Sequence, residues 1–195
     1  MTKYQNIYRN GTIRAQWWDY GENAAYFVTI CTKNRIHYFG EIENKQMNYS
    51  EIGKIAKSLW YEIPKQFPYT KLEAFVVMPN HVHGILIIDK PIKKQSNQNI
   101  AIENQEIDKG GFAGNKNPML NENISRILRW YKGRCSFDIR KIGFDFQWQS
   151  RFYDHIIRDE SAFGRISDYI VNNPNNWKED TFHIDNFEKS KFGKE

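Results

Sequence analysis

The stretch VVMPNHVHGILII, residues 76–88, decides the fold because it holds two apolar runs separated by a turn signal. Pro79 and Asn80 are typical of a turn, so the KLEAFVV segment before them and the HVHGILIID segment after them are predicted to be strands. His81 and His83 open the second of these strands. Because side chains on a strand alternate between its faces, both imidazoles are predicted to lie on one face.

The segments on either side of this stretch give an order of β-α-β-β-α-β-α. The predicted strands outside it are AYFVTICT (25–32) and FQWQSRFYDHIIRD (146–159). One helix should be capped by Ser50 and end at Pro64, with Ile52, Ile55, Ala56, Leu59 and Ile63 on its apolar face. A second helix should begin near Asn121, with an apolar stripe of Ile124, Ile127, Leu128, Tyr131 and Cys135.

A third helix should be capped by Ser161 and ended by Pro174. The first six elements have the ferredoxin-like order of an α+β protein: an antiparallel sheet with two helices on one face. The other face of the sheet is left open for a site.

We expect one domain, because 195 residues can bury a core without disulfides or structural metals. A basic and aromatic arm, residues 1–24, should precede the domain at 25–177, and a polar tail, 178–195, should follow it. Residues 90–118 are polar and lack periodicity, which predicts a long mobile loop. The sequence has no apolar run long enough to span a membrane, and its two cysteines lie far apart. These features predict a soluble cytoplasmic protein with free thiols.

Charge and aromatic content point to a partner that carries phosphates. The net charge is +5, the sequence pI is about 9.1, and aromatic residues make up 15% of the chain. Positive charge neutralises phosphates, and exposed aromatic rings next to Arg and Lys stack on unpaired bases. These features favour single-stranded nucleic acid, although most aromatic side chains must belong to the core.

The histidine pair has two interpretations. Imidazoles at alternate positions of a strand can bind one divalent metal, or both rings can lie in the core with hydrogen bonds to the backbone. The spacing of the other histidines does not match a structural zinc site, which needs four ligands. A hydrated Mg²⁺ or Mn²⁺ with an added oxygen ligand is the better match, and Mn²⁺ suits imidazole more.

The third helix carries a second group of candidates. Phe163, Ile166 and Ile170 form its predicted buried stripe, Tyr169 flanks that stripe, and Asn173 lies one turn further on. A phenol and an amide oxygen on one ridge can reach the same phosphate. Taken alone, Tyr169 is as well explained as a tyrosine at the core edge, and Asn173 as a helix C-cap.

Three motifs in this order, PNHVHGILII, WQSRFYDHIIRD and DYIVNNP, resemble the REP-associated branch of the single-tyrosine transposases in the HUH endonuclease superfamily. The similarity spans residues 24–177. It implies the ferredoxin-like fold, with a tyrosine helix against the open face of the sheet. It also implies that His81 and His83 bind the metal, that Tyr169 is the nucleophile, and that Asn173 completes the metal site, where related branches often have glutamine.

The resemblance further implies metal-dependent nicking and strand transfer on single-stranded DNA that folds into a REP-like hairpin, through a 5′-phosphotyrosine. The metal polarises the phosphate, and Tyr169 attacks phosphorus. A monomer is favoured over a homodimer, the location is the cytoplasm at the nucleoid, and the loop at 90–118 is longer than the family pattern. The candidate DNA contacts are basic or aromatic: Arg126, Arg129, Lys132, Arg134, Trp148, Arg151 and Arg158.

Two other functions use the same residues. The protein could be a catalytically inactive protein that binds single-stranded or hairpin DNA. It could also be a metal-dependent phosphodiesterase that uses water, with Tyr169 in a structural role. His155 is a further candidate for the third metal ligand, ranked below Asn173.

Overall fold

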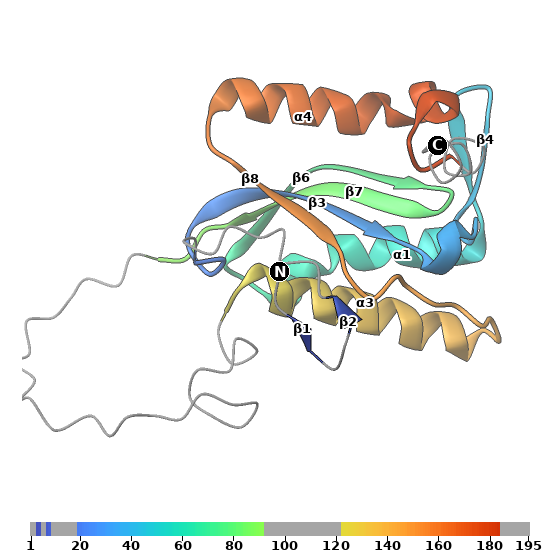
Figure 1. The fold of residues 1–195 in the computed structure, drawn as a ribbon, viewed down its shortest axis with the longest axis horizontal. Coiled ribbons are helices and arrows are strands. Elements are labelled where there is room, and N and C mark those ends of the chain that lie inside the picture. The colour runs from blue at the N-terminus through green and yellow to red at the C-terminus, as the bar shows by residue number, and fades with distance from the viewer. Residues whose placement is uncertain (1–2, 5–6, 9–18, 92–121, 184–195) are drawn as a thin grey trace, which may run out of the picture.

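The computed structural model describes residues 3–4, 7–8, 19–91 and 122–183 (Figure 1). Most of the predicted loop at 90–118, most of the arm at 1–24 and most of the tail at 178–195 lie outside these residues. Two strands of two residues, β1 (Lys3–Tyr4) and β2 (Ile7–Tyr8), pair antiparallel near the N-terminus. The division into arm, domain and tail stays a prediction.

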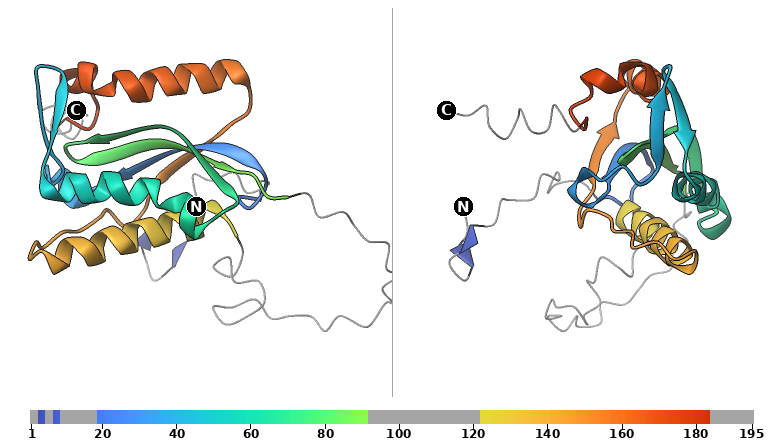
Figure 2. Two further views of the ribbon diagram at one scale, coloured as in Figure 1. Left: turned by 180° about the vertical axis from the view of Figure 1, so that it is seen from behind. Right: turned by 90° about the vertical axis from the view of Figure 1, so that its right-hand side faces the viewer.

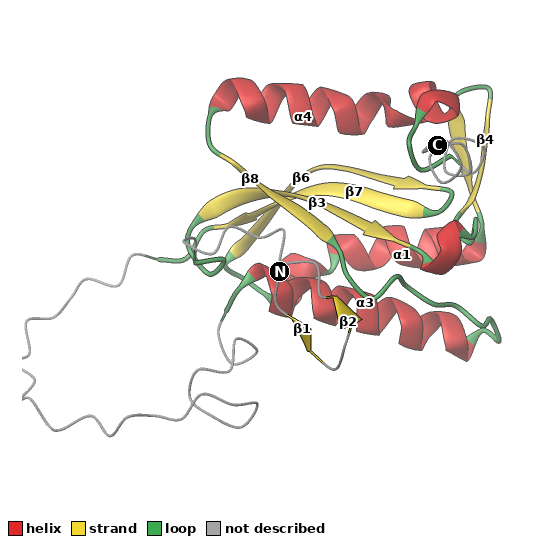
Figure 3. Cartoon of the chain, in the orientation of Figure 1, coloured by secondary structure: helices red, strands yellow, loops and turns green. Residues whose placement is uncertain are grey.

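The centre of the fold is a four-stranded antiparallel sheet with the order β6-β7-β3-β8 (Figure 3). Its strands are β3 (Ala24–Cys31), β6 (Thr70–Met78), β7 (His81–Ile88) and β8 (Tyr153–Ile157). Pro79 and Asn80 form the turn between β6 and β7, as predicted. This is the ferredoxin-like arrangement, so the predicted α+β fold class is confirmed. A separate hairpin, β4 (Gly40–Glu43) and β5 (Gln46–Tyr49), follows β3.

Two helices, α1 (Glu51–Tyr61) and α3 (Ile124–Lys141), cover one face of the sheet (Figures 1 and 2). Their apolar stripes are buried against it, and full burial of one Ile or Leu side chain contributes about 1.5–3 kcal/mol. Tyr131 Oη donates to the Ala56 carbonyl at 2.9 Å, which ties α3 to α1. No helix among the described residues is long and apolar enough to cross a membrane.

Helix α4 (Glu160–Asn172) lies on the opposite face, and a short 3₁₀ helix, η2 (Asn173–Glu179), follows it. Ile170 of α4 packs in a second apolar cluster with Met78 and Ile85, and the predicted stripe residues Phe163 and Ile166 flank that cluster. The face that the sequence leaves open is therefore covered by the tyrosine-bearing helix.

Four local predictions are corrected by the structure. The cap of α4 is Asp159, whose carboxylate accepts from the Ala162 N–H at 2.8 Å, because the chain already turns at the end of β8; Ser161 lies within the first turn. Pro64 does not end α1, which stops at Tyr61; it occupies the first turn of a short helix, α2 (Ile63–Gln66), where its missing N–H costs nothing.

The predicted strand at 146–159 forms a ladder only over Tyr153–Ile157. The residues before it touch the sheet through one isolated bridge between Thr32 and Trp148. Lys132 Nζ donates to the carbonyls of Gln149 at 2.6 Å and Ser150 at 3.3 Å. A side chain therefore takes the place of a strand partner in this segment. Helix α3 begins at Ile124, with Asn123 rather than Asn121 before it, and the Asn123 side chain accepts from the Arg126 N–H.

Candidate metal and tyrosine site

The two histidines lie side by side at the start of β7, on the face under α4. His81 and His83 are 0% and 1% exposed, and their ring centroids are 4.5 Å apart. In the sheet register, His83 stands opposite Thr29 of β3 on one side and Val76 of β6 on the other. The predicted placement of both rings on one face is what the geometry shows.

Asn80 fixes which nitrogen of His81 carries the proton. Its amide nitrogen donates to the carbonyls of Arg35 at 3.2 Å and Phe182 at 2.9 Å, which directs its Oδ1 to His81 Nδ1 at 2.8 Å. An amide oxygen only accepts, so Nδ1 is protonated and Nε2 carries the lone pair. Nε2 is buried without a hydrogen-bond partner. An imidazole oriented in this way is suited to bind a metal ion.

His83 connects the sheet to the tyrosine helix. Its Nδ1 lies 2.8 Å from Thr29 Oγ1, and its Nε2 lies 3.3 Å from Tyr169 Oη. Burial, followed by the charge of Arg35, lowers the pKa of His83 to about 3. Burial, followed by the charges of His83 and Arg35, lowers the pKa of His81 well below its usual value. Both rings are neutral at neutral pH, which is the form that binds metals.

Asp180 supplies a carboxylate that the sequence did not predict for this site. One carboxylate oxygen of Asp180 and one nitrogen of each histidine all lie within 4.8 Å of one another. Oδ1 accepts from the Phe182 N–H at 2.7 Å, while Oδ2 lies 4.0 Å from His81 Nε2. Burial raises the pKa of Asp180 above the usual value of a carboxyl group. Two neutral imidazoles and a carboxylate are a donor set that suits a divalent metal such as Mn²⁺.

Asn173 is buried between the tyrosine and the carboxylate. Burial, followed by the charge of Asp180, raises the pKa of Tyr169, while a hydrogen bond from Asn173 lowers it. A hydrogen bond from Asn173 likewise lowers the pKa of Asp180. The amide nitrogen of Asn173 therefore donates to these two groups, and its amide oxygen is buried without a hydrogen-bond partner. The structure thus brings Tyr169 and Asn173 to the histidine pair.

Phe182 covers the histidine pair. Its ring centroid lies 4.7 Å from that of His81 and 5.9 Å from that of His83. The guanidinium of Arg35 lies over the Phe182 ring, 4.1 Å from its centroid. Tyr169, by contrast, is 45% exposed. The nucleophile candidate is reached from solvent, whereas the candidate metal ligands are shielded by residues that follow η2.

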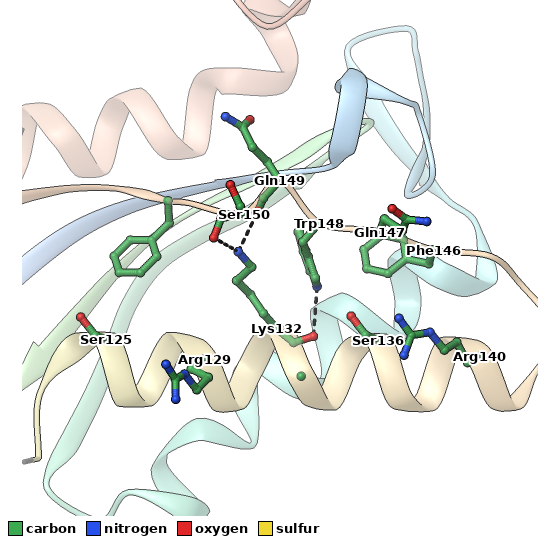
Figure 4. A pocket seen from close by; sticks show the side chains of 12 residues that line it. Ser125, Arg129, Lys132, Ser136, Arg140, Phe146, Gln147, Trp148, Gln149 and Ser150 are labelled. Atoms are coloured by element: carbon green, nitrogen blue, oxygen red, sulfur yellow. Dashed lines mark hydrogen bonds between the residues drawn. The ribbon is translucent and has the colours of Figure 1, made fainter. Parts of the chain in front are cut away.

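A basic groove lies on the other side of the sheet, between α3 and residues 146–152 (Figure 4). Its volume is about 560 Å³, and Arg129, Lys132, Arg140, Gln147, Trp148 and Gln149 are among the residues that line it. Trp148 Nε1 donates to the Lys132 carbonyl at 3.1 Å, so the indole is held against α3. Arg129 and Arg140 extend the positive charge along the helix, and Gly133 between them leaves the floor open.

The structure divides the predicted DNA contacts into two groups. Arg129, Lys132 and Trp148 line the groove. The others lie outside it and are exposed on α3 or beside β8: Arg126, Arg134, Arg151 and Arg158. Arg134 forms a salt bridge with Asp138, with Nε 2.9 Å from Oδ2. His155 is exposed on β8 and is not part of the group formed with Asp180.

Comparison with known proteins gives a relative and a fold. No protein-family model matches the chain. A protein of Haemophilus influenzae (strain ATCC 51907 / DSM 11121 / KW20 / Rd), described as uncharacterized, is 35% identical over 186 residues, which is 94% of this chain and 99% of that protein. The solved structure of a REP-associated tyrosine transposase bound to a REP hairpin superimposes with a TM-score of 0.54 at 17% identity, over 84% of this chain and 74% of that one. This likeness establishes a shared fold.

Proposed function

The chain belongs to the same family as the Haemophilus influenzae protein, and we propose that it is a metal-dependent enzyme that nicks and rejoins single-stranded DNA in the manner of the REP-associated tyrosine transposases. The observation that carries the proposal is the 3.3 Å distance between Tyr169 Oη and Nε2 of His83. A phenol beside a buried, neutral histidine pair and a carboxylate is an arrangement suited to phosphoryl transfer.

His81, His83 and Asp180 would hold the cation, with Asn173 Oδ1 as a further oxygen donor. The burial of His81 Nε2 and Asn173 Oδ1 without hydrogen-bond partners supports this set. Mg²⁺ and Mn²⁺ are the candidate ions, and imidazole ligands favour Mn²⁺. When bound, either ion supplies positive charge that offsets the negative charge of a phosphate oxygen.

Tyr169 is the proposed nucleophile. Its Oη attacks the phosphorus of a phosphodiester, the bond from phosphorus to the 3′-oxygen breaks, and the phenol proton ends on that oxygen. The products are a 5′-phosphotyrosine and a 3′-hydroxyl, so a later 3′-hydroxyl can reverse the step and restore the phenol. Burial and the charge of Asp180 raise the pKa of Tyr169, and the hydrogen bond from Asn173 offsets part of that rise.

The substrate is proposed to be a folded single strand, a REP-like hairpin with unpaired bases beside it. Arg129, Lys132 and Trp148 gather on the groove, and its positive charge and aromatic ring suit a phosphodiester backbone and unpaired bases. Arg126, Arg134, Arg151 and Arg158 are proposed as further contacts. A monomer in the cytoplasm, at the nucleoid, is the proposed form and location.

The test is to incubate the protein with end-labelled hairpin DNA and Mn²⁺ or Mg²⁺, and to separate the products on a denaturing gel. The DNA that flanks the gene is the first substrate to try. We expect a covalent protein–DNA species with the wild type and none with Tyr169→Phe. Tyr61→Phe is the matched control, because Tyr61 is 53% exposed on α1, and it should form the species at the wild-type level.

The same experiment separates the two alternatives. Cleavage without a covalent species indicates a phosphodiesterase that uses water. Binding without cleavage at any tested metal concentration indicates a catalytically inactive hairpin-binding protein. An adduct of undiminished yield with Tyr169→Phe rules out Tyr169 as the nucleophile.

A further inference from the structure

A row of side chains leads from the histidine pair to the exposed edge of the sheet. Strand register places Val76, His83, Thr29 and Tyr153 opposite one another on four neighbouring strands. Thr29 points to the α4 face, since its hydroxyl lies 2.8 Å from His83 Nδ1. Directly opposite residues share a face, so Tyr153 also lies on the α4 face. The outer end of the row is β8, an edge strand of this sheet.

Tyr153 is exposed there, and one ring, Phe27, contacts both Tyr153 and the proposed nucleophile. Its side chain is 48% exposed, and Tyr169 is 45% exposed. Phe27 lies between them: its ring centroid is 6.3 Å from that of Tyr153 and 6.1 Å from that of Tyr169, and both contacts are edge-to-face. Helix α4 packs mainly over β6 and β7, and at the start of β8 the Tyr153 ring stays exposed to solvent.

Core packing does not explain this tyrosine. A ring that is half exposed contributes only part of the apolar burial of a core residue, and Tyr153 belongs to neither apolar cluster. An exposed aromatic ring next to a phosphoryl-transfer site offers a flat surface to a base. Every base has such a face, so stacking holds a strand in place whatever its sequence.

We propose that Tyr153 stacks on an unpaired base of the nucleotide adjacent to the phosphate that Tyr169 attacks, and thereby positions the strand. This inference rests on the proposed function. Tyr153 Oη is not required for stacking, whereas the ring is. The ligand is therefore a nucleobase of single-stranded DNA at one defined position relative to the cleaved bond.

The test compares Tyr153→Ala, Tyr153→Phe and Tyr61→Ala in the adduct assay. Loss of one stacked base costs about ten-fold in substrate use. We expect Tyr153→Ala to slow adduct formation by about that factor at subsaturating DNA, while Tyr153→Phe and Tyr61→Ala stay at the wild-type rate. Substrates with a single abasic site on either side of the cleaved phosphate then locate the base. One of them should slow the wild type equally and leave Tyr153→Ala no slower.

The outcomes separate the inference from the proposed function. If the wild type forms an adduct and Tyr153→Ala matches Tyr61→Ala, the stacking role is wrong. The role is also wrong if both abasic substrates slow Tyr153→Ala as much as they slow the wild type. If the wild type forms no adduct, the proposed function fails. Stacking is then judged by the affinity of each variant for intact and abasic strands, where only the intact strand should distinguish Tyr153→Ala from wild type.

Discussion

Strand β7 presents two different surfaces to its neighbours. Val82, Gly84 and Leu86 face α1 and α3, while His81 and His83 alternate with them and face α4. On the first surface the packing is tight: the Trp60 ring stacks on Phe75 with centroids 4.5 Å apart, over the space that Gly84 leaves. On the second surface, His81 Nε2 and Asn173 Oδ1, both on potential metal ligands, are buried without a hydrogen-bond partner. One strand therefore serves the core on one side and carries the candidate site on the other.

The largest expected effect follows from removing a histidine from the second surface. His83→Ala should lower adduct formation on the order of 10³-fold, because one metal ligand is worth several kcal/mol of transition-state stabilisation. Excess chelator should do the same to the wild type. The separation of surfaces predicts that His83→Ala still folds, which circular dichroism measures.

Calorimetric titration with Mn²⁺ supplies the control. His155→Ala should bind Mn²⁺ as the wild type does, because His155 is exposed and outside the cluster. Equal Mn²⁺ affinity for His83→Ala and the wild type would falsify the assignment of the pair as metal ligands.

Acid should destabilise the metal-free protein, prepared with excess chelator, because His83 on the second surface must stay unprotonated when folded. The pKa of His83 is about 3 when folded, against about 6.5 unfolded, so the unfolded state binds the extra proton between these values. The contribution of neutral His83 to the free energy of unfolding is then fully present above pH 6.5 and is lost as the pH falls toward 3. The loss approaches about 1.4 kcal/mol per pH unit within that window.

Urea unfolding at pH 7, 5.5 and 4.5 measures this slope. His83→Phe should show a shallower decline than the wild type, since it removes a group that must gain a proton on unfolding. A decline of the same steepness in both proteins would mean that other groups control acid unfolding.

Gly84→Ala should test the first surface. A Cβ at Gly84 would lie 2.4 Å from Cζ2 of Trp60, and Trp60 is confined by Phe75 and Tyr131. Overpacking of this kind costs about 1–3 kcal/mol, which thermal unfolding measures. Mn²⁺ affinity should stay unchanged where the variant is folded; a weakened affinity would show that the two surfaces are coupled.

Gly133→Ala is the matched control for this substitution. Apart from its chain neighbours and the backbone of its own helix, no described atom lies within 4 Å of its Cβ position, and a helix gains about 0.5–1 kcal/mol from this change. The two glycines should therefore shift the melting temperature in opposite directions.

The smallest effects are expected in the groove, which belongs to neither surface of β7. Arg129→Ala and Arg140→Ala should each weaken DNA binding several-fold and reduce the slope of log affinity against log salt by about one. Fluorescence anisotropy at several salt concentrations measures both. Lys65→Ala is the control, since Lys65 of α2 pairs with Glu62 and does not line the groove. Salt slopes identical to that of Lys65→Ala would place the DNA elsewhere.

Much of the fold was predictable because local chemistry determines it. The turn at Pro79 and Asn80, the Ser50 cap and the apolar stripe of α3 each depend on residues close in sequence, and the structure confirms all three. The same holds for the shared face of the two histidines. Alternation along a strand is a rule of backbone geometry that needs no tertiary information.

Asp180 could not be predicted in the same way. It reaches the histidines only because α4 and η2 return the chain to the sheet, and its surroundings in the sequence have no period. The available signal was an acid between Trp177 and Phe182, two aromatic residues that pack against the histidine rings. The length of β8 was missed for a related reason: a lysine from α3 binds the carbonyls at 149 and 150.

The Asn80 side chain joins three stretches of chain, because its amide reaches the carbonyls of residues 35 and 182 as well as its neighbouring imidazole. During synthesis on the ribosome, the histidines emerge almost a hundred residues before Phe182 and Asp180. The complete donor set therefore cannot exist on a nascent chain that has made only the sheet. On the proposed function, the metal is acquired after translation of the domain, and a partly synthesised chain is unable to cut the cell's DNA.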